Sequence, residues 1–307
     1  MGVHVAEKQQ LPVADTGAGP DTRGYLDYLL TNRNFTAPAV AAAVASITPE
    51  ISGRPLRVLD AGTGAGGALP ELIALVRAAG GPGGTVVAVD VDERAVEVAG
   101  RQLGDLNLGA APVDLRVADL RDVAAGAVTS GERFDLIWSS DVVWPTTFDN
   151  PAEVVQTLAG ALVPGGTLAL FTTNYYQSML LPGHSRLERL IRTASELTWG
   201  LPGDGPTHYE RLGAWLRAAG LADVAVRAFP LAGMASEPAA RAFLEQIVWP
   251  EMRHAVASHG RAAGMSETDI VRAGELLDPE GPAWVGDDPH TYVVQPTLLW
   301  TGRTPVA

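Results

Sequence analysis

The sequence predicts an α/β fold in which helices cover both faces of a mostly parallel sheet. Short apolar runs alternate with helical patterns from about residue 55 to Phe171, an order that is typical of parallel sheets. One of these runs, Leu56–Leu59, ends in Asp60, and a helical pattern follows over Leu69–Arg77. Between them stand three glycines at alternate positions, Gly62, Gly64 and Gly66. This strand–turn–helix unit indicates a ligand site at the carboxyl edge of the sheet.

Composition limits the function further. The chain has 307 residues, 47% of them hydrophobic, which is enough to bury a full core. Its net charge of −13 argues against nucleic-acid and anionic membrane partners, which need a basic face. The absence of cysteine excludes disulfides and thiolate metal sites and favours a reducing compartment. We therefore expect a cytoplasmic protein that acts on a small molecule, and a homodimer is compatible with the sequence.

The N-terminal region precedes the alternating pattern. Residues 1–20 lack the apolar core of a signal peptide, and we expect a disordered tail there. Residues 21–307 are expected to form a single domain. Its first part, about residues 21–50, predicts two helices over Gly24–Asn32 and Pro38–Ile47. The second is too short to cross a bilayer and is expected to pack against the sheet.

The glycine turn does not by itself identify a ligand. Glycine has no Cβ, so the turn can adopt positive φ and leave bare backbone beside a ligand, and the next helix presents free N–H groups. The segment Gly62–Gly67 also satisfies the dinucleotide pattern G-x-G-x-x-G, which keeps an NAD-dependent oxidoreductase as a lesser alternative. Asp60, however, stands two places before the first glycine, where dinucleotide folds usually carry an apolar residue.

Two more carboxylates end the next two predicted strands. Asp90 follows Thr85–Val89 and suits a bidentate grip on a ribose diol. Asp119 follows Val113–Ala118, where an acid can reach an adenine amino group. With Asp60, these residues resemble the glycine motif, ribose acid and adenine-side acid of the class I S-adenosylmethionine-dependent methyltransferases.

The resemblance extends along most of the chain. Phe134–Asp141 resembles the fourth strand of that family and the loop after it, and Leu162–Leu168 its Pro-Gly-Gly turn before the fifth. Thr297–Arg303 resembles the last strand, which is antiparallel. The similarity covers about residues 55–230 and this last strand, and it implies a Rossmann-like seven-stranded sheet with S-adenosylmethionine as cofactor. It also implies cofactor contacts at Asp60, Gly62, Thr63, Gly64, Gly66, Asp90, Val91, Asp119, Leu120 and Ser139.

The second half departs from the family pattern. Helical patterns over about His184–Trp199 and Tyr209–Ala219 lead to a sixth strand, Ala222–Phe229. About sixty residues then separate it from the last strand, where the family usually has a short hairpin. We expect a helical insertion between the sixth and seventh strands, a lid over about residues 231–290, with the last strand within residues 291–307.

Local signals place the elements of this insertion. Ser236 is predicted to cap a helix over Glu237–Ser258. Ser266, with Asp269 three residues later, predicts a capping box and a second helix to about Leu277. Pro296 cannot donate to a strand ladder, so pairing of the last strand should begin near Thr297 or include a bulge. The apolar face of the first helix either packs on the sheet or covers an acceptor.

Methyl transfer needs a general base only if the acceptor keeps its proton at neutral pH. His184, His208 and His290 lie on loops that can reach the carboxyl edge, and the first two are the stronger candidates. Asp141 follows the fourth strand, where it can orient donor or acceptor or cap a turn. No metal site is expected, because Glu251 and His254 form an i, i+3 pair without a second such pair.

These observations predict an enzyme that transfers a methyl group from S-adenosylmethionine to oxygen or carbon of a small hydrophobic metabolite, such as a polyketide, in secondary metabolism. The segment Ser140–Pro145 lacks the Asn-Pro-Pro-aromatic motif of enzymes that methylate nucleobases or glutamine amides. The alternative is a cyclase or pericyclase that binds the same cofactor and rearranges a metabolite without methyl transfer.

Overall fold

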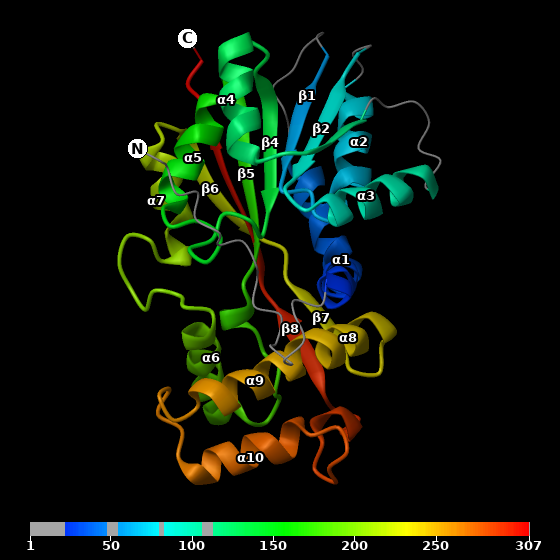
Figure 1. Ribbon diagram of the computed structural model, residues 1–307, viewed down its shortest axis with the longest axis vertical. Helices are drawn as coiled ribbons and strands as arrows, with labels where there is room; N and C mark the ends of the chain where they lie inside the picture. The colour runs from blue at the N-terminus through cyan, green and yellow to red at the C-terminus, as the bar shows by residue number, and fades with distance from the viewer. Residues whose placement is uncertain (1–21, 48–54, 80–82, 106–112, 307) are drawn as a thin grey trace, which may run out of the picture.

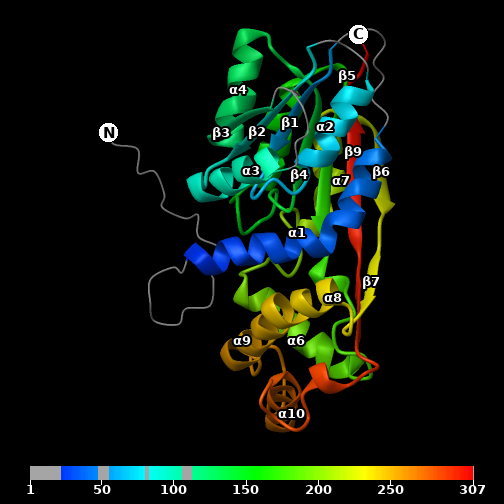
Figure 2. The ribbon, with the colours of Figure 1, turned by 90° about the vertical axis from the view of Figure 1, so that its right-hand side faces the viewer.

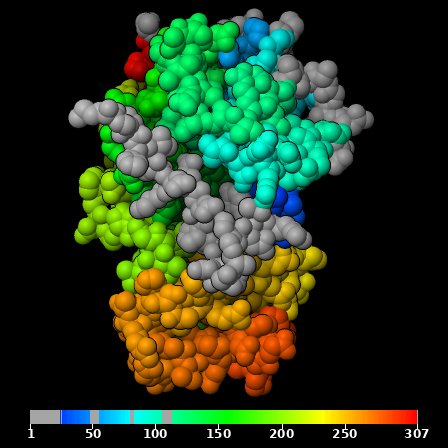
Figure 3. All heavy atoms as spheres, viewed as in Figure 1, coloured from blue at the N-terminus to red at the C-terminus, as the bar shows by residue number. Residues whose placement is uncertain are grey.

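The computed structural model describes residues 22–47, 55–79, 83–105 and 113–306. The expected disordered tail, residues 1–20, lies outside them. In Figure 1, the upper part of the molecule is a sheet with the helices that cover it, which we call the sheet lobe. The lower part is a group of helices, which we call the helical lobe. In the space-filling view, the yellow and orange helices of residues from about 238 onward form the lower end of the molecule (Figure 3). Among the described residues, no helix is long and apolar enough to cross a membrane.

The sheet lobe is built on seven strands in the order β3-β2-β1-β4-β5-β9-β6. Strands β1 to β5 are parallel to one another, and β9 is antiparallel to both β5 and β6. This confirms the expected Rossmann-like sheet with an antiparallel last strand. Because the strand order reverses between β1 and β4, their carboxyl ends form the crevice where α/β sheets bind ligands. The strands are β1 (Arg57–Ala61), β2 (Thr85–Asp90), β3 (Val113–Val117), β4 (Phe134–Ser140), β5 (Leu162–Thr173), β6 (Ala222–Ala228) and β9 (Thr297–Arg303).

Helices cover both faces of this sheet, as the alternation predicted (Figure 1). Successive strand residues point to opposite faces, so Leu59 and Ala61 pack with α4, α5 and α7, whereas Val58 packs with α1 and α2. Full burial of each large apolar side chain contributes roughly 1.5–3 kcal/mol. The helices are α1 (Thr22–Ala45), α2 (Leu69–Ala78), α3 (Glu93–Asp105), α4 (Leu120–Ser130), α5 (Pro151–Gly160) and α7 (Leu212–Ala218).

The Pro-Gly-Gly segment forms part of β5 instead of a turn before it. The pairing of β4 with β5 shifts register between Phe134 and Leu136, and Gly165 has a φ of +76°. A Cβ on Gly166 would lie 2.9 Å from the Val163 carbonyl oxygen. These residues therefore form a bulge, which lets β5 bend and continue along β4.

The expectation of two N-terminal helices is wrong, because α1 runs through Pro38 as one element. Proline has no N–H to donate to Asn34, and it commonly kinks a helix instead of ending it when tertiary contacts hold both sides. Here Phe35 packs in the helical lobe and Val40 against the sheet. Figure 2 shows α1 changing direction as it passes from one lobe to the other.

The helical lobe contains elements from two parts of the chain. A two-stranded ribbon of β7 and β8 runs into it from the sheet (Figure 2), so the region from residue 231 begins with a strand that was not expected. Pro296 separates β8 from β9, and pairing of β9 begins at Thr297 as predicted. The elements are α6 (Ser185–Thr198), β7 (Leu231–Met234), α8 (Pro238–Phe243), the π-helical segment η3 (Leu244–Val248), α9 (Trp249–His259), α10 (Glu267–Leu277) and β8 (Tyr292–Gln295).

The first predicted insertion helix differs in detail from the structure. It begins at Pro238 with Glu237, not Ser236, at the N-cap, and η3 interrupts its regular winding. Pro250 follows this segment and cannot donate to the preceding turn, so the wider π-helical turn accommodates it. The predicted capping box of α10 is confirmed, since Ser266 and Asp269 each accept a hydrogen bond from the other's backbone N–H.

Candidate functional site

The glycine turn lies at the carboxyl end of β1 and is tied to β2. Gly62, Gly64 and Gly66 have φ values of +82°, +52° and +78°. The N–H groups of Gly62 and Thr63 donate to the Val89 carbonyl at 2.9 and 2.8 Å. A Cβ on Gly62 would lie 2.3 Å from the nearest methyl carbon of Val142. Both the backbone conformation and the space around it therefore require glycine at this position.

Asp90 at the end of β2 fits the ribose role. One carboxylate oxygen accepts a hydrogen bond from the Gly64 N–H at 2.8 Å and the other from the Asp92 N–H at 3.0 Å. A carboxylate offers about four lone-pair sites, so two remain for a diol. The next residue, Val91, exposes 48% of its surface and offers an apolar platform beside the turn. The residues present thus fit an adenosyl group.

Asp60, near the end of β1, stabilises the glycine turn. It is 2% exposed, and its Oδ2 accepts a hydrogen bond from the Thr63 hydroxyl at 2.7 Å. Burial, with a smaller contribution from the negative charge of Asp90, raises the pKa of Asp60 to about 7, and the Thr63 hydrogen bond opposes this rise. Its contacts show it holding the shape of the glycine turn.

The remaining predicted cofactor residues lie at the same sheet edge but have protein partners. The Asp119 carboxylate accepts from the Arg121 N–H at 2.8 Å and from its Nε at 3.0 Å, so it caps α4. The Arg121 guanidinium lowers the pKa of Asp119. Leu120 is buried, and the Ser139 hydroxyl donates to the Ala61 carbonyl at 2.8 Å, which joins β4 to β1.

Asp141 connects the carboxyl ends of β4 and β5. Its φ of +54° is rare for a residue with a side chain. The carboxylate accepts two hydrogen bonds from Thr173, one from the backbone N–H and one from the hydroxyl, both 2.6 Å long. Burial raises the pKa of Asp141 to about 6, and the Thr173 bonds oppose the rise. Strained residues fixed in this way often occur at functional sites.

The structure does not bring the two favoured histidines together. His184 immediately precedes α6, whose first turn carries Arg186, bound to Asp269 of α10 at 2.6 Å. His208 precedes the short 3₁₀ helix η2 (Tyr209–Arg211) and stacks on Tyr209 with ring centroids 4.3 Å apart. Burial raises the pKa of Glu196, near the other end of α6, and the nearby His208 opposes this rise. Fourteen helical residues span roughly 21 Å. His290 is exposed.

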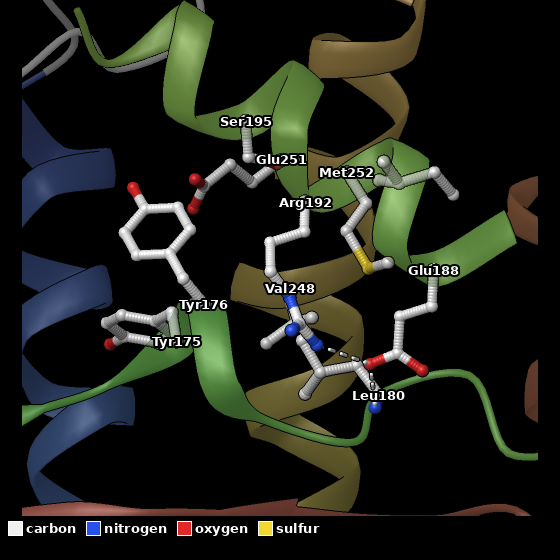
Figure 4. Close-up of a pocket in the computed structure, with 10 residues that line it drawn as sticks. Tyr175, Tyr176, Leu180, Glu188, Arg192, Ser195, Val248, Glu251 and Met252 are labelled. Carbon is white, nitrogen blue, oxygen red and sulfur yellow. Dashed lines mark hydrogen bonds and ion pairs between the residues drawn. The ribbon is translucent and has the colours of Figure 1, made fainter. Parts of the chain in front are cut away.

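A small pocket lies between α6, α9 and the short 3₁₀ helix η1 (Tyr175–Gln177); it has a cavity volume of about 40 Å³ and opens to solvent. Its first lining residue, Tyr175, comes two positions after Thr173, which donates a hydrogen bond to Asp141. Figure 4 shows its lining residues: Tyr175, Tyr176, Leu180, Glu188, Ile191, Arg192, Ser195, Val248, Glu251 and Met252.

Two charged residues of the pocket bind each other and the neighbouring loop. Glu188 accepts from the backbone N–H groups of Leu180 and Leu181 at 2.8 and 3.1 Å. Arg192 lies 3.8 Å from Glu188 and donates to the Ser178 carbonyl at 2.9 Å. This pair is neutral as a unit and fixes the loop that follows η1.

Glu251 is the third charged residue of the pocket. Its Oε1 accepts a hydrogen bond from the Trp199 indole N–H, and burial raises its pKa against the effect of that bond. Figure 4 shows its carboxylate pointing toward Tyr176. Sequence reasoning considered Glu251 only as half of a metal pair. Its spacing from the buried residues Val248 and Met252 indicates a carboxylate on the inner face of α9.

Helix α1 connects the glycine turn to this pocket. Leu29 lies 3.8 Å from where a Cβ on Gly64 would stand, and Arg33 donates to the Ala65 carbonyl at 3.3 Å. From the neighbouring position of the same helix, the Asn32 amide oxygen accepts a hydrogen bond from the Tyr175 hydroxyl at 3.0 Å. Burial raises the pKa of Tyr175 well above its usual value, so Tyr175 stays a neutral hydroxyl.

Among the described residues, no group of three or more His, Asp or Glu side chains is arranged to hold a metal ion.

Comparisons with known proteins agree with this arrangement. A family model for a methyltransferase domain matches residues 59–168, which include the glycine turn, Asp90, Asp119 and Asp141. No curated protein matches the sequence significantly.

Several solved structures are similar in fold. A methyltransferase-like protein of Bacillus halodurans is 16% identical, with 87% of this chain and 99% of that chain covered and a TM-score of 0.49. The YcgJ protein of Bacillus subtilis is 15% identical, with 88% of this chain and 99% of that chain covered and a TM-score of 0.47. Phosphoethanolamine N-methyltransferase 2 of Haemonchus contortus is 15% identical, with 87% of this chain and 52% of that chain covered and a TM-score of 0.44.

The family model covers the segment that carries the glycine turn and the strand-end carboxylates, and the observed strand order places the antiparallel strand where the sequence predicted it. Residues 59–168 thus match a methyltransferase domain, the family that the glycine motif and the strand-end carboxylates resemble.

Proposed function

We propose that this enzyme transfers a methyl group from S-adenosylmethionine to an oxygen or carbon atom of a small hydrophobic metabolite. The observation that carries the proposal is the pocket between η1, α6 and α9, whose first lining residue follows the end of β5, just beyond the segment that matches the methyltransferase-domain model. Leu180, Ile191, Val248 and Met252 give it an apolar wall. The net charge of −13 favours such an acceptor, in the cytoplasm, over nucleic acids or membrane surfaces.

The cofactor supplies an electrophilic methyl group on a sulfonium when it is bound. We assign the ribose diol to Asp90, the adenine ring to the neighbourhood of Val91, and the bare backbone of the glycine turn to the rest of the nucleoside. Asp141 and Thr173 fix the ends of β4 and β5 relative to each other, so they position the boundary between donor and acceptor. Alignment of this kind contributes roughly 7–11 kcal/mol in favourable cases.

The helical lobe acts as the lid in this proposal, since residues 231–290 supply α8, η3, α9 and α10. It shields the transfer from water. Where the acceptor keeps its proton, His208 is better placed as general base than His184. Tyr209 stacks on His208 and also contacts Tyr176 of the pocket and Trp144, three residues after Asp141, with ring centroids 5.4 and 5.0 Å away.

Asp90→Ala tests the cofactor site by calorimetric titration with S-adenosylhomocysteine. Charge-assisted hydrogen bonds contribute roughly 1.5–3 kcal/mol each, so we expect affinity to fall by about tenfold to a hundredfold. Asp122→Ala, an exposed carboxylate in the first turn of α4, is the matched control and should bind normally. Normal affinity in Asp90→Ala would remove this residue from the ribose site.

Incubation with donor carrying a labelled methyl group and candidate metabolites tests the reaction itself. Label in the product supports transfer. Conversion of a metabolite without incorporation of label, in a reaction that still requires the bound donor, would replace transfer by a rearrangement.

A further inference from the structure

Glu251 is a carboxyl group that no cationic side chain among the described residues balances. Among the described residues it accepts one hydrogen bond, from the Trp199 indole, and no cationic side chain forms an ion pair with it. Arg192, the cation that lines the same pocket, is engaged by Glu188 and by the Ser178 carbonyl. When Glu251 is ionised, the three titratable residues of the pocket therefore sum to one negative charge.

A purely structural role explains this carboxylate poorly. An indole N–H needs only a neutral acceptor, which the amide of glutamine also provides. Removing a charge from water costs several kcal/mol unless a partner compensates it. A partly buried carboxylate that points into a pocket and has one neutral donor is thus arranged for a partner from outside the protein.

The surroundings of Glu251 indicate the chemistry of that partner. The rings of Tyr175 and Tyr176 line the side of the pocket toward which the carboxylate points (Figure 4). Aromatic faces attract cations, and a carboxylate pairs with an ammonium group through charge-assisted hydrogen bonds. The opposite wall of Leu180, Val248 and Met252 suits an apolar body attached to such a group.

We propose that this pocket binds a protonated amine carried by the acceptor, with the Glu251 carboxylate as its counter-ion and Tyr175 and Tyr176 beside the ammonium group. The inference rests on the proposed function in taking this pocket as the acceptor site. The amine anchors the acceptor, and the atom that receives the methyl group is a separate part of the molecule.

Trp199 reports on this site because its indole donates to Glu251. The protein would be labelled with 5-fluorotryptophan, and Trp199→Phe would assign the ¹⁹F resonance of Trp199. We expect 2-phenylethylamine to shift this resonance in a saturable manner and its neutral analogue 2-phenylethanol to bind at least tenfold more weakly. Equal affinity for the two compounds, or no shift with the amine, would overturn the proposal.

Variants separate the charge from the shape of the pocket. Glu251→Gln keeps an acceptor for the indole and removes the charge, so we expect amine affinity to fall at least tenfold and the weak binding of the alcohol to persist. Glu245→Gln is the matched control, since Glu245 lies in the same helical run but pairs with Arg241 outside the pocket. Unchanged amine binding in Glu251→Gln would contradict the assignment.

Titration of the same samples with S-adenosylhomocysteine distinguishes two kinds of failure. If the wild-type protein binds this compound but not the amine, the amine site is wrong and the methyltransferase site stands. If it binds the amine but not S-adenosylhomocysteine, the cofactor assignment fails and the amine site stands. A thermal melt confirms that Glu251→Gln is folded, and the comparison of amine with alcohol on the wild-type protein needs no variant.

Discussion

Gly62 is constrained in both its conformation and its surroundings. Its φ of +82° suits glycine, and a Cβ would overlap Val142, which lies in the loop after Asp141. Two loops at the sheet edge approach each other closely at this residue. The conformation of the glycine turn therefore depends on that of the segment after Asp141, and the reverse. A substitution here disturbs both sides of the crevice.

Gly62→Ala should therefore destabilise the protein by about 2 kcal/mol or more, since a left-handed conformation alone costs an L-residue roughly 1–2 kcal/mol. Urea denaturation measures the effect. Gly126→Ala is the matched control, because Gly126 lies within α4 with no other atom within 4 Å of its added methyl group, and should stabilise by roughly 0.5–1 kcal/mol. Adding Val142→Ala to Gly62→Ala should recover part of the loss; no recovery would contradict the overlap.

The buried carboxyl of Asp60 makes stability depend on pH. Its pKa is about 7 in the folded protein and near 3.8 when unfolded, so between these values the folded state holds a proton that the unfolded state has lost. The resulting stability is fully present below about pH 4 and is lost as the pH rises through about 7. Asp141 contributes in the same direction up to its pKa of about 6.

Asp60→Asn should accordingly lose less stability than the wild-type protein between pH 5 and pH 8, because the amide keeps an acceptor for Thr63 and does not titrate. The free energy of unfolding in urea at the two pH values gives the comparison. The exposed Asp149 provides a control, Asp149→Asn, whose pH dependence should match that of the wild type. If the free energy of unfolding of Asp60→Asn fell as steeply with pH as that of the wild type, another group would be responsible for the pH dependence.

At the scale of elements, the capping box of α10 also connects two helices. Asp269 binds Ser266 in the box and Arg186 at the start of α6, so the start of α10 is tied to α6. The Arg186 guanidinium holds the pKa of Asp269 well below its usual range. The cap thus serves both local helix formation and packing.

Ser266→Ala should lower the free energy of unfolding by roughly 0.5–2 kcal/mol, the usual effect of losing an N-cap side chain. Hydrogen exchange of the first α10 amides would accelerate with it. Ser258→Ala, on the exposed surface of α9, is the matched control and should change neither measurement. Equal effects of the two substitutions would show that the capping box contributes little to this helix.

On the scale of the whole molecule, α1 is the element that joins the lobes. Phe35 of α1 stacks on Phe243 of α8 with centroids 4.2 Å apart, and Thr31 donates to Gln246 at 2.9 Å. The same helix covers the glycine turn through Leu29 and Arg33. Binding of a ligand in the cofactor site should therefore also stabilise the side of the helical lobe that α1 contacts.

S-adenosylhomocysteine should slow hydrogen exchange in α1 around Leu29 and Arg33 as well as in the glycine turn. Ligand binding stabilises every segment whose opening breaks the site. The matched comparison lies within the protein, since α10 packs on α9 away from the glycine turn and should change less. Protection confined to the glycine turn would show that α1 moves independently of the cofactor.

The sequence by itself determined the sheet, the glycine turn and the Asp90 position. Each depends on a pattern within one strand–turn–helix unit, where period, glycine placement and strand-end charge act over a few residues. The start of β9 after Pro296 and the capping box of α10 were predictable for the same reason.

Only the tertiary structure decided which side chains meet. It made α1 a single helix through Pro38, put His184 and His208 at opposite ends of α6 and turned Glu251 into the pocket. These outcomes depend on contacts such as Tyr175 with Asn32, which lie 143 positions apart in the chain. Local propensity holds no information about such contacts, because they arise from how whole elements pack around a shared core.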